Sequence, residues 1–130
     1  MIIQYNCPVD PADLADLRAC VGWPRMQEDL SNPRMTSFYH IAAYDGSRLV
    51  AFVDCVSNGV TDAYIQDLMV HPDHQRMGLG RELMQAMIAH LKQEGIFIVS
   101  VLYDESLRDY YRQFGFTEMY AGQMELREGR

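Results

Sequence analysis

The chain has 130 residues, of which 48% are hydrophobic, and it carries a net charge of −7 at pH 7. This length fits a single domain, residues 1–130, that buries about two-thirds of its unfolded surface. The hydrophobic fraction excludes a disordered chain, and the acidity argues against a nucleic-acid surface, which would carry a basic patch.

The first third of the chain predicts one strand and two helices. Met1 to Tyr5 is a short apolar run typical of an edge strand. Pro8 to Cys20 is predicted as a helix, with Asp10 as its N-cap and Pro11 at the first helical position. Arg25 to Leu30 indicates a second, short helix.

Three antiparallel strands are predicted next. Ser37 to Tyr44 and Arg48 to Val56 are joined by a hairpin turn at Asp45-Gly46-Ser47. Ala63 to Val70 is rich in apolar, β-branched and aromatic residues and stops before Pro72. Strand order along the chain therefore predicts a meander in this region.

A long amphipathic helix follows, ending at Gly95. Its apolar stripe recurs every three or four residues, at Leu79, Leu83, Met84, Met87, Ile88 and Leu91. The apolar run Ile96 to Tyr103 predicts a buried strand, parallel to Ala63–Val70 because a helix connects them. A helix over 105–114 and a hairpin of Phe116–Tyr120 and Gln123–Leu126 complete the chain. The fold class is α+β (mixed α/β), a mostly antiparallel sheet of about six or seven strands flanked by helices.

The segment between Val70 and the long helix predicts an anion site. Gly78 and Gly80 lie where the helix begins, and a helix start offers unpaired N–H groups and the positive end of the peptide dipole. Glycines there let a ligand approach the backbone closely, which is typical of phosphate sites. A simple turn is the alternative, since a Gly-x-Gly pair alone is weakly specific.

Cysteine usage and apolar runs limit the class of protein further. Cys7, Cys20 and Cys55 are odd in number and contain no Cys-x-x-Cys pair, so no disulfide framework and no metal site are expected. No apolar run is long enough to span a membrane, and no signal-peptide layout is seen at the N-terminus. We therefore expect a cytoplasmic protein without membrane or nucleic-acid partners.

Three stretches in consistent order and spacing carry a family resemblance. Gln75 to Gly80 fits the pattern Gln/Arg-x-x-Gly-x-Gly/Ala, Leu68 to Pro72 forms the strand end before it, and Tyr110 to Phe116 is similar to a Phe-Tyr-x-x-x-Gly-Phe helix end. Together they resemble the GNAT superfamily of acetyl-CoA-dependent N-acetyltransferases. Val21 to Pro24 also looks like a stretch found in members that act on aralkylamines.

The resemblance implies a central pair of parallel strands that splay apart to hold acetyl-CoA as co-substrate, without a metal. The pyrophosphate would lie on the N–H groups of the glycine turn, and the pantetheine arm would pair with the preceding strand. The residues implied in cofactor binding are Leu68, Met69, Val70, Gln75, Arg76, Met77, Gly78, Leu79, Gly80, Arg81 and Asp104.

Catalysis by the family requires a proton acceptor for the amine and a donor for the leaving thiolate. The pattern assigns the donor to Tyr111, with Tyr110 as competitor. Asp67 is the candidate base, although strand alternation directs it to the opposite face unless a bulge reorients it. A water relay ordered by Gln66 and Tyr64 is the alternative.

The expected acceptor is the primary amine of a small cationic substrate, which the negative charge of the chain suits. Trp23 is a candidate wall of its pocket, or else an anchor to the core. A protein lysine or N-terminal amine acetyltransferase and a non-catalytic acyl-CoA sensor are the alternatives. The last hairpin could supply the edge of a homodimer.

Overall fold

The computed structural model of the chain describes residues 1–129 and contains one five-stranded sheet in the order β1-β2-β3-β4-β5. Strands β1 to β4 pair antiparallel, and β4 and β5 pair parallel, as the helical connection between them predicts. The strands are β1 (Ile2–Tyr5), β2 (Tyr39–Asp45), β3 (Arg48–Ser57), β4 (Asp62–Val70) and β5 (Ile98–Val101).

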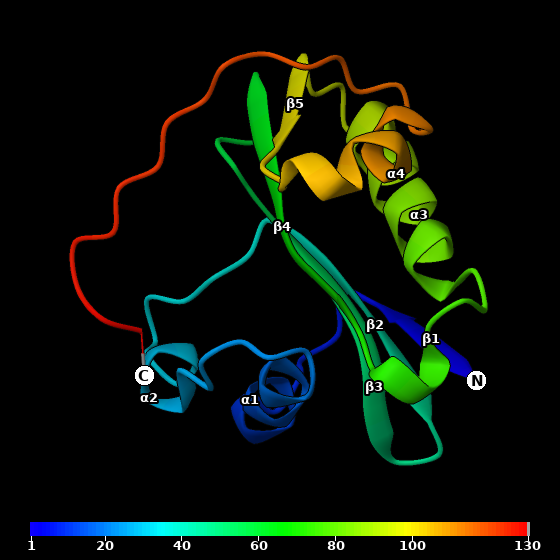
Figure 1. Cartoon of the computed structure of the whole chain (residues 1–130), viewed down its shortest axis with the longest axis vertical. Coiled ribbons are helices and arrows are strands. Elements are labelled where there is room, and N and C mark those ends of the chain that lie inside the picture. Colours follow the sequence, from blue (N-terminus) through cyan, green and yellow to red (C-terminus); the bar gives the residue numbers. More distant parts are fainter. Residues whose placement is uncertain (130) are drawn as a thin grey trace.

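Helices cover both faces of this sheet, which confirms the predicted α+β class (Figure 1). Helix α1 packs against one face of β3 and β4, and α3 packs against the other face of β2 to β4. No helix within residues 1–129 is both long and apolar enough to cross a membrane. The helices are α1 (Pro11–Cys20), α2 (Gln27–Leu30), α3 (Leu79–Gln93) and α4 (Arg108–Arg112), with 3-10 turns η1 (Pro72–His74) and η2 (Glu105–Leu107).

Helix α1 begins as the sequence predicts. The Asp10 side chain accepts a 2.9 Å hydrogen bond from the N–H of Ala12, and Pro11 occupies the first turn, where its missing N–H costs nothing. Leu17 on the inner face packs with Phe52 and Met69 in a small core between α1 and the sheet. This contact fixes α1 beside the middle of β3 and β4.

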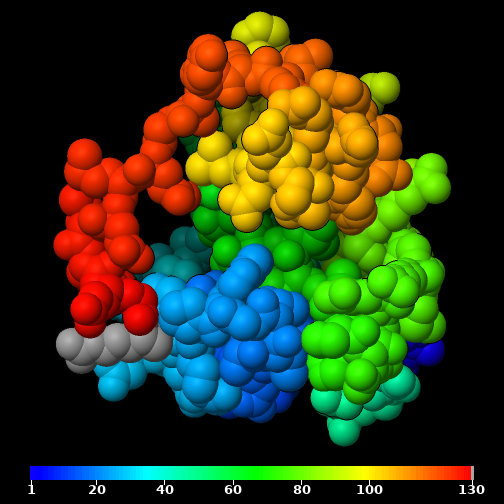
Figure 2. Space-filling model, viewed as in Figure 1, coloured from blue at the N-terminus to red at the C-terminus, as the bar shows by residue number. Residues whose placement is uncertain are grey.

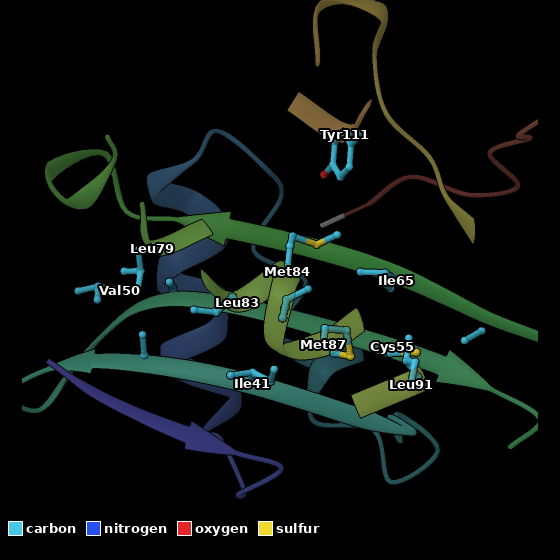
Figure 3. Packing of buried hydrophobic residues seen from close by; sticks show 14 residues of the cluster. Ile41, Val50, Cys55, Ile65, Leu79, Leu83, Met84, Met87, Leu91 and Tyr111 are labelled. Atoms are coloured by element: carbon cyan, nitrogen blue, oxygen red, sulfur yellow. The ribbon is translucent and has the colours of Figure 1, made fainter. Parts of the chain in front are cut away.

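Helix α3 forms the larger core with the stripe that its periodicity predicts (Figure 3). Its fully buried residues are Leu83, Met84, Met87 and Leu91, and they pack on Ile41, Val50, Val53 and Ile65 of the sheet. Each such side chain stabilises the fold by about 1.5–3 kcal/mol through burial. The core therefore holds α3 firmly across β2 to β4, and residues 75–78 connect η1 to its first residue.

The C-terminal third departs from the prediction in two ways. The strand predicted over 96–103 is present and parallel to β4, but β5 is only four residues long and Ile98 is 43% exposed, so the predicted length and burial are wrong. The predicted hairpin of 116–120 and 123–126 is also wrong, because residues 117–129 form an extended C-terminal tail without strand pairing.

Candidate functional site

A β-bulge in β4 sets the geometry of the candidate site. Phe52 pairs with Met69, but Asp54 pairs with Gln66, so β4 contains one residue more than β3 across this interval. Asp67 lies in this interval with φ 57°, in the left-handed region. A bulge of this kind reorients the side chain of the extra residue. The structure therefore contains the bulge that Asp67 needs in order to turn toward the site.

The bulge opens onto a cavity of about 360 Å³, here called the bulge pocket. It is bounded by α1, by the segment between α2 and β2, and by β3 and β4. Gln66 and Asp67 both line it, although they are adjacent in the chain. Asp54 and His40 line it as well, together with Arg18 and Arg34, and half of its sixteen lining residues are apolar. The pocket thus brings two carboxylates together at the bulge.

Asp54 is a site residue that sequence reasoning missed. One carboxylate oxygen accepts a 3.1 Å hydrogen bond from the Gln66 amide, and the other accepts a 2.8 Å bond from the N–H of Cys55. Burial raises the pKa of Asp54, and these hydrogen bonds offset part of that rise. A signal was present, because Asp54 is the only charged residue in the apolar stretch from Leu49 to Val56.

Asp67 has a cationic neighbour. Its carboxylate lies 3.7 Å from the guanidinium of Arg18 on α1. Burial raises the pKa of Asp67, and the Arg18 charge opposes that rise. Arg18 also lies over the ring of Trp23, with its guanidinium carbon 5.4 Å from the ring centroid. Trp23 is 38% exposed and does not line the bulge pocket, so it reaches Asp67 only through Arg18.

Beyond the bulge, β4 and β5 separate. Their parallel pairing runs from Asp62 and Ile98 to Ile65 and Val101, where β5 ends. β4 continues to Val70 and pairs with β3 along its other edge. The β5-facing main-chain groups of residues 66–70 therefore have no strand partner among residues 1–129. Leu68, Met69 and Val70, which the resemblance implicates in cofactor binding, lie on this unpaired edge.

The glycine loop (residues 75–81) lies at the end of that free edge. Gly78 has φ 77° and caps the start of α3, and Arg76 has φ 66°, so its backbone adopts a conformation that glycine tolerates best. Within residues 1–129, the main-chain N–H groups of residues 76–81 find no hydrogen-bond acceptor. A row of free donors at a helix start is suited to bind an anion.

The side chains of the glycine loop leave those donors accessible. Gln75 turns back, and its amide donates a 3.0 Å hydrogen bond to the carbonyl of Val70. Arg76, Met77 and Arg81 are exposed, whereas Leu79 is buried in the core. Asp104 is exposed at the residue before η2, just beyond the end of β5, and its side chain makes no cap bond. The two arginines supply positive charge beside the free N–H groups.

Gly80 is required by a close approach rather than by its backbone conformation. A Cβ atom at this position would lie 2.9 Å from the Tyr110 hydroxyl and 3.3 Å from Val70 Cγ2. Tyr110 on α4 therefore packs directly over the first turn of α3. This contact joins α4 to the glycine loop and fixes the orientation of its neighbour Tyr111.

Tyr111 lies at the junction of α4 and the large core and is only 7% exposed. Its ring stacks on Tyr103 at 4.6 Å and meets Tyr110 edge to face at 5.2 Å. Figure 3 shows the side chain extending from α4 toward Met84. Burial, with contributions from Tyr110, Tyr64 and Tyr103, raises the pKa of Tyr111 to about 12, so the phenol keeps its proton at neutral pH.

Tyr64 lies on β4 two positions before the bulge, and its charge is one of the influences on the pKa of Tyr111. It lies on β4 opposite Val56 and beside Ser100 of β5, two positions before Gln66. Burial, then the charge of Asp67, raises the pKa of Tyr64. The structure therefore arranges the predicted polar residues along β4 in the order Tyr64, Gln66, Asp67. Residues 1–129 contain no cluster of three or more His, Cys, Asp or Glu side chains placed to hold a metal ion.

Comparison with known proteins agrees with this geometry. The family model described as Acetyltransferase (GNAT) family matches residues 9–116. Serotonin N-acetyltransferase 2, chloroplastic, of Oryza sativa subsp. japonica is 30% identical over 114 residues, covering 84% of this chain and 57% of the relative. Histone acetyltransferase TAP1 of Glycine max is 32% identical over 128 residues, covering 89% of this chain and 55% of the relative. The chain thus spans little more than half the length of these curated relatives.

Solved structures agree on the fold. A probable acetyltransferase of meticillin-resistant Staphylococcus aureus superposes with a TM-score of 0.85 at 21% identity, covering 98% of this chain and all of the other. A GNAT family acetyltransferase of Streptococcus pneumoniae superposes with a TM-score of 0.78 at 27% identity, covering 98% of each chain. The overall fold of this chain therefore recurs in known acetyltransferase structures.

Proposed function

Because the chain belongs to the GNAT family of acetyltransferases, we propose that it moves acetyl from acetyl-CoA to the primary amine of a small cationic substrate. The amine attacks the thioester directly, with both substrates bound at once. The observation that carries the acceptor class is the pair of carboxylates, Asp54 and Asp67, in a pocket of about 360 Å³ at the β4 bulge. Arg18 and Arg34 line the same pocket, and Arg18 lies 3.7 Å from Asp67, so the charge of Asp67 is partly offset. The hydrogen-bond partners of Asp54 are neutral, and a buried carboxylate without a cationic partner favours a cationic ligand.

The donor side rests on the free main-chain groups of the glycine loop and β4. Acetyl-CoA supplies the activated acetyl group when bound. The N–H groups of residues 76–81 would hold its pyrophosphate, with Arg76 and Arg81 adding positive charge. The unpaired edge of Leu68 to Val70 would bind the pantetheine amides as an added strand would. A main-chain N–H near Met69 would then donate to the thioester oxygen.

Proton transfer follows from the same residues. An alkylamine has a pKa near ~10, so about one molecule in a thousand is neutral at pH 7. Asp67 accepts the ammonium proton, directly or through a water held by Gln66, while Asp54 holds the cation. As the nitrogen–carbon bond forms and the carbon–sulfur bond breaks, the nitrogen would release its second proton to water. Tyr111 would donate a proton to the leaving sulfur and then recover one from water. Burial favours this role for Asp67, because it raises the pKa of a base otherwise too weak.

Two other functions are supported by specific observations. The relative named as a histone acetyltransferase favours a protein lysine or N-terminal amine as acceptor, since such a side chain could also enter the bulge pocket. The Arg18 contact with Asp67 favours a non-catalytic acyl-CoA sensor, because it partly neutralises the proposed base. The small-amine acceptor is preferred because α1 and residues 34–37 wall the pocket.

An amine panel with detection of free coenzyme A tests the proposal. The panel contains arylalkylamines, polyamines, and lysine and N-terminal peptides, each with acetyl-CoA. We expect thiol release with a small cationic amine and none with its neutral analogue. Release only with peptides would favour the protein acceptor. Thermal stabilisation by acetyl-CoA without release in any well would favour the sensor and contradict catalysis.

A further inference from the structure

A serine and a histidine that the proposed mechanism does not use form a hydrogen-bonded pair in the wall of the bulge pocket. Ser37 Oγ lies 2.8 Å from His40 Nδ1, and both residues line the pocket. Ser37 comes from the segment between α2 and β2, and His40 is the second residue of β2. Figure 2 shows α1 (blue) against green residues from the middle of the chain, on the side of the molecule where this pocket lies. The pair therefore borders the space in which the acceptor amine is proposed to bind.

The other ring nitrogen of His40 fixes the direction of this hydrogen bond. Nε2 contacts the main-chain carbonyl of Cys7, which can only accept, so Nε2 carries the proton of the neutral ring. Nδ1 is then an acceptor, and the Ser37 hydroxyl donates to it. The lone pairs of Ser37 Oγ remain able to accept a hydrogen bond from a ligand in the pocket.

Asn6 holds the Cys7 carbonyl beside the imidazole. Its backbone has φ 54°, in the left-handed region, which asparagine adopts more readily than most residues. The Asn6 side chain accepts a 3.3 Å hydrogen bond from the N–H of His40, and the Asn6 N–H donates a 2.7 Å bond to the His40 carbonyl. The ring therefore keeps its orientation when it gains a proton, because Nε2–H still donates to Cys7 and the new Nδ1–H donates to Ser37.

Asp54 is the direct partner of His40 across β2 and β3. Directly opposed side chains share one face of the sheet, with Cβ atoms about 4.5–5.5 Å apart. Burial raises the pKa of Asp54, and the charge of His40 is among the influences that lower it, so an imidazolium and this carboxylate stabilise each other. An ammonium held by Asp54 would thus lie next to the Ser37–His40 pair. The other charged side chains of the pocket are Arg18, Arg34 and Asp67, and the Cys7 thiol is turned to the Tyr5 carbonyl.

We propose that Ser37 and His40 carry away the second proton of the amine, an inference that rests on the proposed acetyl transfer. Asp67 takes the first proton, and the nitrogen still holds one proton too many once its bond to the acetyl carbon has formed. That proton passes through water to Ser37 Oγ, as the Ser37 hydroxyl proton moves to His40 Nδ1. After the products leave, the same path in reverse returns the proton to solvent and restores the neutral imidazole. His40 therefore acts through Ser37.

The pH dependence of kcat at saturating amine and acetyl-CoA tests this relay, because kcat reports the groups that titrate in the complex with both substrates. Histidine changes charge between about pH 5 and 8, so the wild type should lose activity as pH falls through this range and His40 becomes protonated. His40→Gln and Ser37→Ala should lower kcat about 10- to 100-fold at the upper end of the range and abolish this dependence on pH. Ser37→Thr keeps the hydroxyl and should restore most of kcat together with the pH dependence. Any decline caused by Asp54 or Asp67 would be shared by all the variants.

Ser31→Ala is the matched control, since Ser31 is exposed at the end of α2 and does not line the pocket. It should leave kcat and its pH dependence as in the wild type. A fall in kcat for Ser37→Ala and His40→Gln with an unchanged pH profile would show that the pair only supports the pocket wall. That result would overturn the relay and leave the acetyl transfer intact, whereas a wild type that releases no thiol with any amine would refute both.

Nitrogen-15 NMR of the imidazole rings gives a readout that needs no turnover. At about pH 8 we expect the wild-type His40 ring in the tautomer that carries its proton on Nε2. Ser37→Ala should shift the Nδ1 resonance, because a hydrogen bond to that atom is lost, and should change Nε2 little. A proton on Nδ1 in the wild type would overturn the relay whatever the activity. Near-ultraviolet circular dichroism would show that Ser37→Ala and His40→Gln keep the packed core.

Discussion

The carboxylate of Asp54 on β3 accepts a 3.1 Å hydrogen bond from the side-chain amide of Gln66, its direct partner on β4. The amide cannot take a proton, but it holds the carboxylate toward the bulge pocket that Asp67 also lines. This pair places the Asp54 carboxylate beside Gln66, which the resemblance implicates in ordering a water relay. The acceptor end of the site is thus built from two strands that meet only in the folded chain.

Removing the Asp54 charge is expected to weaken the use of cationic amines. Asp54→Asn keeps the size of the side chain but removes the charge that would pair with the ammonium, so kcat/KM should fall about 10- to 100-fold. The measurement is steady-state thiol release with the best amine of the panel. Asp62→Asn, at the exposed start of β4, is the matched control and should leave kcat/KM unchanged. Equal loss in both variants would contradict the role of Asp54.

The same variant is expected to change how stability depends on pH. Burial raises the pKa of Asp54 above 3.8, so the folded state binds its proton more tightly than the unfolded state does. The free energy of unfolding therefore falls as pH rises from about 3.8 through the raised pKa, and the loss is complete above it. Asp54→Asn removes this penalty.

Urea unfolding at a series of pH values measures that effect. The stability of Asp54→Asn relative to wild type should increase between pH 3.5 and 7 and then level off, by about 1.4 kcal/mol for each unit of pKa rise. The variant would then gain relative stability at neutral pH while losing activity. A stability difference that stays constant with pH would show that burial does not raise the pKa of the Asp54 carboxylate in the folded state.

Tyr111→Phe is expected to slow turnover without loss of acetyl-CoA affinity. Phenylalanine keeps the ring stacked on Tyr103 and removes only the proton donor, so kcat should fall roughly 100-fold or more if Tyr111 protonates the thiolate. Pre-steady-state rates and calorimetric binding separate the two effects. Tyr110→Phe is the control, and a larger loss of rate in that variant would assign the role of proton donor to Tyr110 instead.

Gly78→Val is expected to weaken acetyl-CoA binding tenfold or more, as measured by isothermal titration. A Cβ atom at this position would meet no atom of the protein within 4 Å, so the added side chain would project into the space from which the loop N–H groups are reached. Its φ of 77° also makes any β-branched residue strained. Gly95→Val, at φ 79° beyond the far end of α3, has the same strain and should bind normally. Unchanged affinity in Gly78→Val would refute the anion site.

Gly80→Ala is expected to destabilise the fold by about 1–3 kcal/mol through overpacking against Tyr110 and Val70. The closest atom to the new Cβ is the Tyr110 hydroxyl at 2.9 Å, whereas the ring carbon that carries it lies at 4.0 Å. Tyr110→Phe should therefore recover part of the loss. A double-mutant cycle in urea measures the coupling. Additive effects would show that the two residues do not meet in solution.

Local patterns predicted much of the chain because local physics decides those elements. The cap at Asp10, the stripe on α3 and the hairpin after Asp45 each depend on residues a few positions apart, and all are confirmed. The burial predicted for β5 and the last hairpin were wrong, because a local pattern indicates that a segment can form a strand but does not identify the segment that would pair with it or cover it. Tail residues Met124 and Leu126 fit a strand, yet they are exposed and pair with no strand among residues 1–129.

By itself, the amino-acid sequence determined the family and the strand, loop and helix around Gly78, and it predicted an anion site there, because each depends on short-range spacing. Only the tertiary structure decided that Asp67 turns inward, that Asp54 joins it, and that Arg18 lies beside it. Bulges and buried charge pairs depend on strand register between distant segments, and register is set by the packing of the whole sheet rather than by neighbours in the chain.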